Sequence, residues 1–283
     1  MKAHPACIPC QVIFALEMAK RATGDEAMVG EIVLESLRII KEAGLRLPPP
    51  RVAKEIIRMT KRRTGVDDPY KEEKGEQNRI GLKLYEMLRG KASLDQAIAF
   101  SAAGNIIDSI AVKGGRVDFQ RLLEDLLRSE ERFSLDDRPH FKERLSQAAS
   151  LLVLGDNAGE IALDRLLLER IREEFPQLRI TYAVRGGPAI NDATLEDADE
   201  VGMGEVSEVI TTGDEAPGVI LEDCSQEFRR RFAEADVILA KGQGNFETLD
   251  ELKDPRIFFL LQAKCPTICE YLGVERFSLI IKS

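Results

Sequence analysis

The spacing of apolar residues divides the chain into two parts that meet near residue 150. Before that point apolar side chains recur every three or four residues, as in the stretches 29–40 and 82–88, and this spacing is typical of amphipathic helices. Glycine, proline and aspartate, which end or cap helices, separate the stretches. The pattern predicts roughly six or seven helices and few strands, so we expect residues 1–148 to form an all-α domain.

After residue 150 the pattern changes to short runs of β-branched and other apolar residues that alternate with amphipathic stretches. This alternation is typical of βαβ units with a parallel sheet, and the right-handed crossover rule favours a doubly wound sheet. We therefore expect an α/β domain over residues 149–283. Its predicted strands cover residues 151–154, 180–184, 209–211, 237–240, 257–261 and 278–281. Its helices are expected to begin near Ala158, Asp192, Ser225, Asn245 and Pro266.

A polar run, GDNAGE, follows the first predicted strand directly. Open parallel sheets bind ligands where a strand turns into a helix, and a glycine-bearing turn there offers N–H groups to an anion. The oxygens of Asp156 and Asn157 are hard ligands that suit Mg²⁺ or Mn²⁺. Asp192, after the second strand, is either a third ligand or a helix N-cap. Glu160 is either a capping carboxylate or the group that positions a water molecule.

A second glycine-containing turn, KGQGN, ends the fourth predicted strand. If the strand order is the common 3-2-1-4-5, this turn faces GDNAGE across the switch point of the sheet. Taken alone, Lys241 reads as a surface lysine, but opposite GDNAGE we favour a phosphate contact. Gly242 and Gly244 would let the backbone approach the ligand closely. Asn245, and Arg185 at the end of the second strand, complete the candidate substrate-binding residues on this side.

One helix of the N-terminal part carries polar residues in its apolar stripe. Asn105 lies in line with Ile98, Ala102 and Ile106, and a buried amide needs hydrogen-bond partners. Asp108 is three residues further on and shares a helix face with Asn105. The pair either points into a cleft between the two parts of the chain, where it contacts substrate, or forms a polar link within the helices.

Composition limits the possible partners. The 283-residue chain has a formal net charge of -9 and a pI near 5.1, so it lacks the broad excess of Lys and Arg that a nucleic-acid backbone requires. Neither the apolar region of a signal peptide nor an apolar span of about 18 residues is present. These features predict a cytoplasmic protein with no membrane partner, and they are compatible with a homo-oligomer.

Several catalytic chemistries lose support because their residues are missing. With His4 and His140 as its two histidines, the chain does not suit a histidine phosphatase, a His-rich zinc hydrolase or a Ser-His-Asp hydrolase. Neither a GxxxxGK[ST] loop nor a DxDx[TV] motif is present, which disfavours Walker-type nucleotide binding and haloacid-dehalogenase chemistry. Catalysis is left to a metal and carboxylates.

The cysteines permit two interpretations. Cys7 and Cys10 have the CxxC spacing used in zinc sites and redox pairs, and Cys265 and Cys269 would complete a four-thiolate site if the chain ends meet. The interpretation that we favour is burial as small apolar thiols.

Four motifs together resemble the DUF89 family of metal-dependent phosphatases, often called damage-control phosphatases. They are GDNAGE, VRGGPAINDAT, AKGQGNFE and AAGNIID, and the resemblance covers nearly the whole chain. The chain is most similar to the compact prokaryotic and archaeal subfamily with an N-terminal CxxC and a Lys-Cys-Pro segment, here Lys264 to Pro266. The resemblance implies a helical N-terminal domain on a Rossmann-like three-layer α/β/α domain with a parallel sheet.

The same resemblance implies a site and a substrate class. A divalent cation, Mn²⁺, Co²⁺, Ni²⁺ or Mg²⁺, would be bound by Asp156, Asn157 and Asp192. The phosphate would be bound by Lys241 and the glycines after it, with contributions from Asn105 and Asp108. The substrates would be small phosphorylated metabolites, such as sugar phosphates or cofactor-related phosphates. The eukaryotic pattern has Asp where this chain has Gln243, so a particular substrate preference does not transfer.

The leading hypothesis is a phosphomonoesterase in which water attacks the phosphoryl group with the help of the metal. Asp156, Asp192 or Glu160 would orient this water, and direct attack by Asp156 is a variant. One alternative is a carboxyl methyltransferase that uses S-adenosylmethionine, although GDNAGE lacks the GxGxG pattern of such sites. The other alternative is a noncatalytic metal-dependent binding protein.

Overall fold

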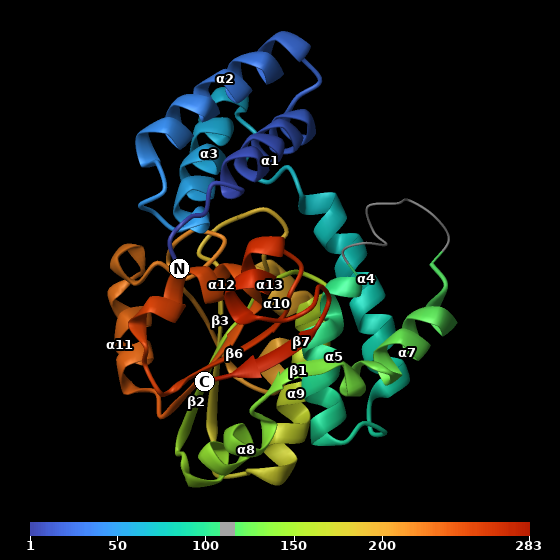
Figure 1. Ribbon diagram of the computed structural model, residues 1–283. Coiled ribbons are helices and arrows are strands. Elements are labelled where there is room, and N and C mark those ends of the chain that lie inside the picture. Colours follow the sequence, from blue (N-terminus) through green and yellow to red (C-terminus); the bar gives the residue numbers. More distant parts are fainter. Residues whose placement is uncertain (108–116) are drawn as a thin grey trace.

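The computed structural model describes residues 1–107 and 117–283, and of Asn105 it describes the backbone. Within these ranges a seven-stranded sheet lies at the centre, helices cover both of its faces, and three N-terminal helices form a bundle at one end (Figure 1). None of the helices in the described ranges is both long enough and apolar enough to cross a membrane.

The sheet has the strand order β1-β7-β6-β5-β2-β3-β4. The pairs β2–β3, β3–β4, β2–β5 and β5–β6 are parallel, and β7 runs antiparallel to β6. The predicted order 3-2-1-4-5 is confirmed, because it corresponds to β4-β3-β2-β5-β6. The switch point therefore lies between β2 and β5. The strands are β1 Phe133–Asp136, β2 Ser150–Leu154, β3 Arg179–Val184, β4 Glu208–Thr211, β5 Val237–Lys241, β6 Ile257–Gln262 and β7 Leu279–Lys282.

Both faces of the sheet are apolar, as expected for parallel strands covered by helices on each side. In β2, Leu151 and Val153 point into one core, whereas Leu152 and Leu154 point into the other. This alternation follows from the two-residue period of a strand. The result is the predicted three-layer α/β/α arrangement.

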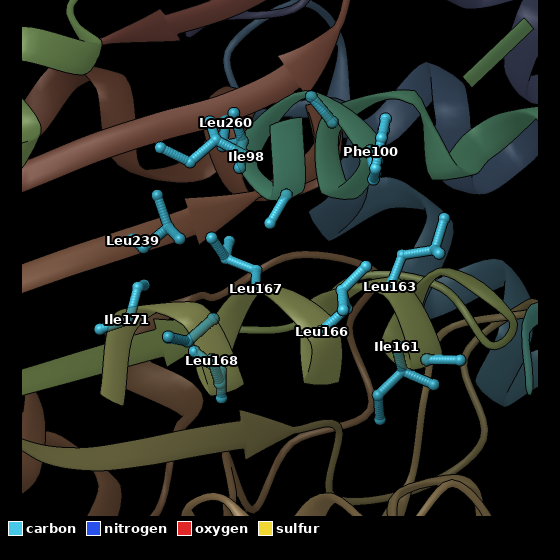
Figure 2. Close-up of a cluster of buried hydrophobic side chains, with 14 of the residues drawn as sticks. Ile98, Phe100, Ile161, Leu163, Leu166, Leu167, Leu168, Ile171, Leu239 and Leu260 are labelled. Carbon is cyan, nitrogen blue, oxygen red and sulfur yellow. The ribbon is translucent and has the colours of Figure 1, made fainter. Parts of the chain in front are cut away.

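In the first outer layer, α4 and α5 pack on α9, and α5 also contacts β6 and β7. Figure 2 shows this core, in which Leu167 of α9 points toward Ile98 of α5 and lies near Leu239 of β5. The helices of this layer are α4 Lys71–Leu88, α5 Leu94–Ala103, α7 Phe119–Leu127, α8 Arg138–Gln147, α9 Glu160–Glu174 and α10 Leu195–Glu200. The second outer layer contains α11 Gln226–Glu234, α12 Gly242–Leu249 and α13 Pro266–Leu272.

The bundle consists of α1 Cys7–Ala22, α2 Glu26–Ala43 and α3 Pro49–Thr64. Its ends carry the expected signals: the Asp25 side chain caps α2 by accepting from the Ala27 N–H at 2.9 Å, and Gly65 ends α3 in the left-handed conformation. Small clusters around Ile56, Ile57 and Ile32 form its interior. The bundle therefore has apolar contacts of its own beside the larger cores of the sheet.

The expectation of an all-α segment before residue 149 is wrong for β1. This strand pairs with β7 at the edge of the sheet, and its side chains alternate between half-buried and exposed. Four residues are too few to give a clear periodic signal. In addition, α4, α5, α7 and α8 cover the sheet and do not join the bundle. A domain boundary near residue 149 stays a proposal.

Candidate active site

The predicted metal ligands meet at the carboxyl end of β2. Asp156 and Asn157 follow this strand, and the chain after β3 doubles back through Ile190, which has a φ of 55°. The Ala193 N–H then donates to the Asp156 carbonyl at 2.8 Å, and Asn157 and Asp192 form an antiparallel bridge. The backbone therefore brings Asp156, Asn157 and Asp192 together, as the sequence predicted.

Arg185, at the end of β3, lies between the two carboxylates. Its Nε donates to Asp192 Oδ2 at 2.6 Å, and its Nη1 donates to Asn245 Oδ1 at 3.2 Å. Its Nη2 lies 4.0 Å from Asp156 Oδ1 and has no hydrogen-bond partner among the described residues. Because the residue is only 2% exposed, this unsatisfied donor makes Arg185 a candidate binding group for an anion.

The two carboxylates favour a cation beside them. Burial raises the pKa of Asp156, although Arg185 and Lys241 oppose the effect. The pKa of Asp192 is raised to about 7, because burial and the Asp156 charge, which raise it, outweigh Arg185, which lowers it. A divalent ion would offset this repulsion, and two carboxylates with an amide oxygen are a suitable hard donor set. The described residues contain no group of three His, Cys, Asp or Glu side chains placed for a metal, and the predicted set uses only two.

Lys241, the last residue of β5, is charged and almost fully enclosed. It is 1% exposed, and its Nζ donates to Asp164 Oδ1 at 2.6 Å and to the Ser101 carbonyl at 2.9 Å. Burial lowers the pKa of Lys241, but Asp164 and Glu160 outweigh this effect and raise it above its ordinary value. The interpretation as a surface lysine is therefore wrong.

Glu160 points into the site from the first turn of α9. Its Oε1 accepts from Asn157 Nδ2 at 3.0 Å, and its Oε2 lies 3.8 Å from Lys241 Nζ. The N-cap of α9 is Gly159. With its carboxylate 1% exposed and directed at these two residues, Glu160 belongs to the site.

Two of the candidate substrate-binding residues have structural tasks. A Cβ at Gly244 would lie 2.1 Å from the Pro217 carbonyl oxygen, so this glycine permits loop packing. The Asn245 amide donates to the carbonyls of Gly155 and Lys241, at 3.2 and 2.7 Å, and accepts from the Val219 N–H at 3.0 Å. Asn245 thus joins the turns after β2 and β5.

Gly242 has a different function in the turn. Its φ is +76°, and a Cβ here would lie 1.8 Å from Asp156 Oδ2. A side chain at this position would displace the Asp156 carboxylate. The glycine therefore permits the close approach of the β5 turn to the carboxylate.

The contribution from the helical side stays a prediction. Asp108 lies outside the described residues, and the Asn105 backbone belongs to the short helix η1, Gly104–Ile106. A Cβ at Gly104 would lie 3.0 Å from Glu160 Cγ, which places the end of α5 directly against the site.

Sequence reasoning missed three residues around the lysine: Ser101, Asp164 and Tyr182. Asp164 is four residues after Glu160 in an otherwise apolar stretch of α9. Because this spacing puts both carboxylates on one face of the helix, it could have indicated that Asp164 lies near the site. Lys264, after β6, belongs to the Lys-Cys-Pro segment, and its charge lowers the pKa of Asp156.

The cysteines form neither a disulfide nor a metal cluster in the described part of the chain. Cys269 is buried and Cys7 is half-buried, whereas Cys10 is exposed. The expectation of burial is therefore wrong for Cys10.

Comparisons with known proteins agree with this picture. The family model of the damage-control phosphatase ARMT1-like domain matches residues 3–280. A damage-control phosphatase of Pyrococcus horikoshii is 34% identical over 283 residues, which cover 99% of this chain and 97% of that protein. A damage-control phosphatase of Archaeoglobus fulgidus is 33% identical over 290 residues, which cover 100% of this chain and 99% of that protein.

A solved structure shows the same fold. The crystal structure of a DUF89 family protein from Pyrococcus horikoshii superposes with a TM-score of 0.93 at 32% identity, covering 99% of this chain and 98% of the other. The chain therefore belongs to the damage-control phosphatase family with an ARMT1-like domain, and it is a phosphatase, as the resemblance predicted.

Proposed function

We propose that the protein is a metal-dependent phosphomonoesterase that acts on small phosphorylated metabolites. The observation that carries this proposal is the meeting of Arg185 and Lys241 with Asp156 and Asp192 at the carboxyl ends of β2, β3 and β5. Buried cations beside a cation-binding carboxylate pair suit a phosphoryl group with a divalent ion.

Asp156, Asn157 and Asp192 would hold the divalent cation, which we expect to be Mn²⁺, Co²⁺, Ni²⁺ or Mg²⁺. When bound, the cation supplies Lewis acidity toward a phosphoryl oxygen and lowers the pKa of water. The bridge between Asn157 and Asp192 supports this assignment, because it holds these two residues side by side. Gly242 supports it as well, because the missing side chain leaves room for the Asp156 carboxylate.

The phosphoryl group would be bound by the protein's own cations. Arg185 offers its unsatisfied Nη2, and Lys241 offers a fixed positive charge that stabilises the oxygens in the transition state. Glu160, held by Asn157 within the site, would orient the attacking water and accept its proton.

A cavity beside Arg185 suits the rest of a small substrate. Its volume is about 580 Å³, which is in the range of metabolite-binding pockets. The lining contains hydroxyl, charged and backbone groups from four segments, among them Lys71, Gly186, Gly187, Thr194 and Glu196. We propose that the alcohol part of the phosphoester occupies this cavity.

The test is the hydrolysis of a panel of sugar phosphates, nucleotides and p-nitrophenyl phosphate by Asp156→Asn and Asp192→Asn. We expect each to lose about 100-fold or more in kcat, and to lose most of the heat of Mn²⁺ binding in calorimetry. Asp199→Asn, an exposed change on α10, is the matched control and should be unaffected. Wild-type turnover in both site variants, or turnover that survives chelator treatment unchanged, would overturn the proposal.

A further inference from the structure

We propose that Asp164 is a positioning residue for phosphoryl transfer, one that fixes the Lys241 ammonium so that a single N–H remains for the substrate. This inference rests on the proposed function of Lys241. It comes from a polar network beneath the site whose four members lie on α5, α9, β3 and β5: Ser101, Asp164, Tyr182 and Lys241. We call it the buried network.

Three donors converge on the Asp164 carboxylate. Its Oδ1 accepts from Lys241 Nζ at 2.6 Å and from Ser101 Oγ at 2.6 Å, and its Oδ2 accepts from Tyr182 Oη at 2.7 Å. The residue is 1% exposed, so water does not compete for these bonds. A carboxylate held from both of its oxygens has little freedom to rotate.

Two of the three N–H bonds of the Lys241 ammonium group are used within the protein. An ammonium group carries three N–H bonds. One donates to Asp164 Oδ1, and a second donates to the Ser101 carbonyl at 2.9 Å. The third is left on the side of Glu160, whose Oε2 lies 3.8 Å away within the site. A lysine side chain is flexible by nature, so two fixed bonds are what give this third N–H a direction.

The surrounding residues preserve this arrangement. A Cβ at Gly155 would lie 2.7 Å from Tyr182 Oη, so glycine at the start of GDNAGE leaves room for the phenol. Burial first, and then the Asp164 charge, raise the pKa of Tyr182 well above its ordinary value, which keeps the phenol a donor.

Only an ionised carboxylate accepts from all three donors. An asparagine at position 164 would turn its NH₂ group toward either Tyr182 or the Lys241–Ser101 pair, and two donors would then face each other. Asp164→Asn is therefore close in shape but loses part of the network, which makes it a suitable probe.

The experiment is a double-mutant cycle on p-nitrophenyl phosphate hydrolysis with Asp164→Asn, Lys241→Met and the double variant. We expect Asp164→Asn to lower kcat about 100-fold with a smaller change in KM. If Asp164 acts through Lys241, the double variant is no slower than Lys241→Met alone. A folded Asp164→Asn enzyme with wild-type kcat, or losses that multiply in the double variant, would overturn the inference.

If Asp164→Asn does not fold, a double substitution of the other two donors to Asp164 tests the same inference. Ser101→Ala with Tyr182→Phe removes two neutral donors and keeps the ion pair between Asp164 and Lys241. We expect kcat to fall about tenfold in the presence of Lys241 and to be unchanged in the Lys241→Met background. Equal losses in both backgrounds would overturn the inference.

The cycle also separates this inference from the proposed function. Full activity of Lys241→Met would overturn both the role proposed for this lysine and the role of Asp164. An inactive Lys241→Met beside a fully active Asp164→Asn would overturn the positioning role alone.

Discussion

Two charged networks connect the N-terminal helices to the sheet, and they differ in depth. The buried network lies under the site, where its ion pair joins side chains that are 1% and 2% exposed. The second lies between α3 and the segment after β4. Its Lys54–Asp214 pair is also buried, with side chains 3% and 5% exposed, whereas its outer side chains are 23% to 39% exposed. We call the second the bundle contact, and its residues are Lys54, Arg58, Lys61, Asp214, Glu215 and Asp223.

The bundle contact holds the three-helix bundle against a loop of the site. Lys54 Nζ lies 2.7 Å from Asp223 Oδ2, and Lys61 Nζ donates to Glu215 Oε2 and to the Pro188 carbonyl, both at 2.8 Å. The loop that contains Glu215 continues to Val219, whose N–H donates to Asn245. The contact therefore reaches the turn after β5, through backbone and not through the catalytic groups.

The difference teaches that ion pairs of the same chemistry have different structural roles when they are buried and when they are partly exposed to solvent. A sealed pair fixes geometry, and removing one partner leaves a charge without compensation in a medium of low dielectric constant. A half-exposed pair holds two surfaces together, yet solvent and salt weaken it. The catalytic groups should depend on the first and tolerate changes in the second.

The largest expected effect is the loss of stability in Lys241→Met. Asp164 and Glu160 would remain buried as carboxylates without their cation, so we expect the free energy of unfolding to fall by about 3–5 kcal/mol. Urea denaturation measures it. Lys142→Met, which removes a pair with Asp95 whose side chains are 32% and 36% exposed, is the control, with an expected loss of about 0–1 kcal/mol. Similar losses in both variants would contradict the contrast.

The fold was predictable because its signals are local and periodic. The apolar runs predicted the strands β2 to β7, and the common doubly wound order matches the arrangement of β2 to β6, since crossover handedness leaves few alternatives. The expectation of a parallel sheet is wrong for β7, which runs antiparallel to β6. The edge strand β1 was missed, because four residues with only half-buried side chains give a weak pattern.

The site was predictable where chemistry follows a strand end, as at Asp156 and Lys241. It was not predictable where partners come from distant elements. In the sequence, little distinguishes Asp164 from other helical carboxylates, because its partners Tyr182 and Lys241 come from two strands that only the tertiary structure brings beside it. Asn245 looks like a ligand contact, but the fold uses its amide to join two turns.

A medium effect is expected when the bundle contact loses one charge. Glu215→Gln keeps the shape but weakens the pairs with Lys61 and Arg58, so we expect a loss of about 1 kcal/mol in 50 mM salt. Because salt screens exposed charges, the loss should shrink at about 1 M salt, while kcat changes little. Urea midpoints at both salt concentrations measure this loss of stability. A loss that does not depend on salt would show that the bundle contact is effectively shielded from solvent.

The two networks should also respond to pH at opposite ends of the scale. Burial would raise the pKa of Glu215, but hydrogen bonds from Lys61 and Arg58 outweigh it and hold the pKa below its ordinary value of 4.5. Such a carboxylate stabilises the folded state above pH 4.5, and the contribution is lost as pH falls through the lower, folded-state pKa. For Lys241, whose pKa is raised above 10.5, the contribution is fully present below pH 10.5 and is lost as pH rises through the higher, folded-state pKa.

Acid titration of stability tests this difference. Below about pH 4.5 we expect the urea midpoint of the wild type to fall, and Glu215→Gln to fall less steeply because its own contribution is already absent. Hydrogen bonding from Lys54 lowers the pKa of Asp223, so Asp223→Asn should flatten the same slope. Identical slopes in all three proteins would show that other carboxylates govern acid unfolding.

The smallest effect is expected away from both networks, at Cys7 and Cys10. Both thiols are free, Cys10 is exposed, and the described residues contain no metal-holding group that includes them. We expect Cys7→Ser with Cys10→Ser to change the free energy of unfolding by no more than about 0.5 kcal/mol and kcat/KM by no more than roughly twofold. If this double variant lost its activity while Asp156→Asn retained it, the catalytic groups would have to be sought at the cysteines, and the contrast between the two charged networks would no longer explain function.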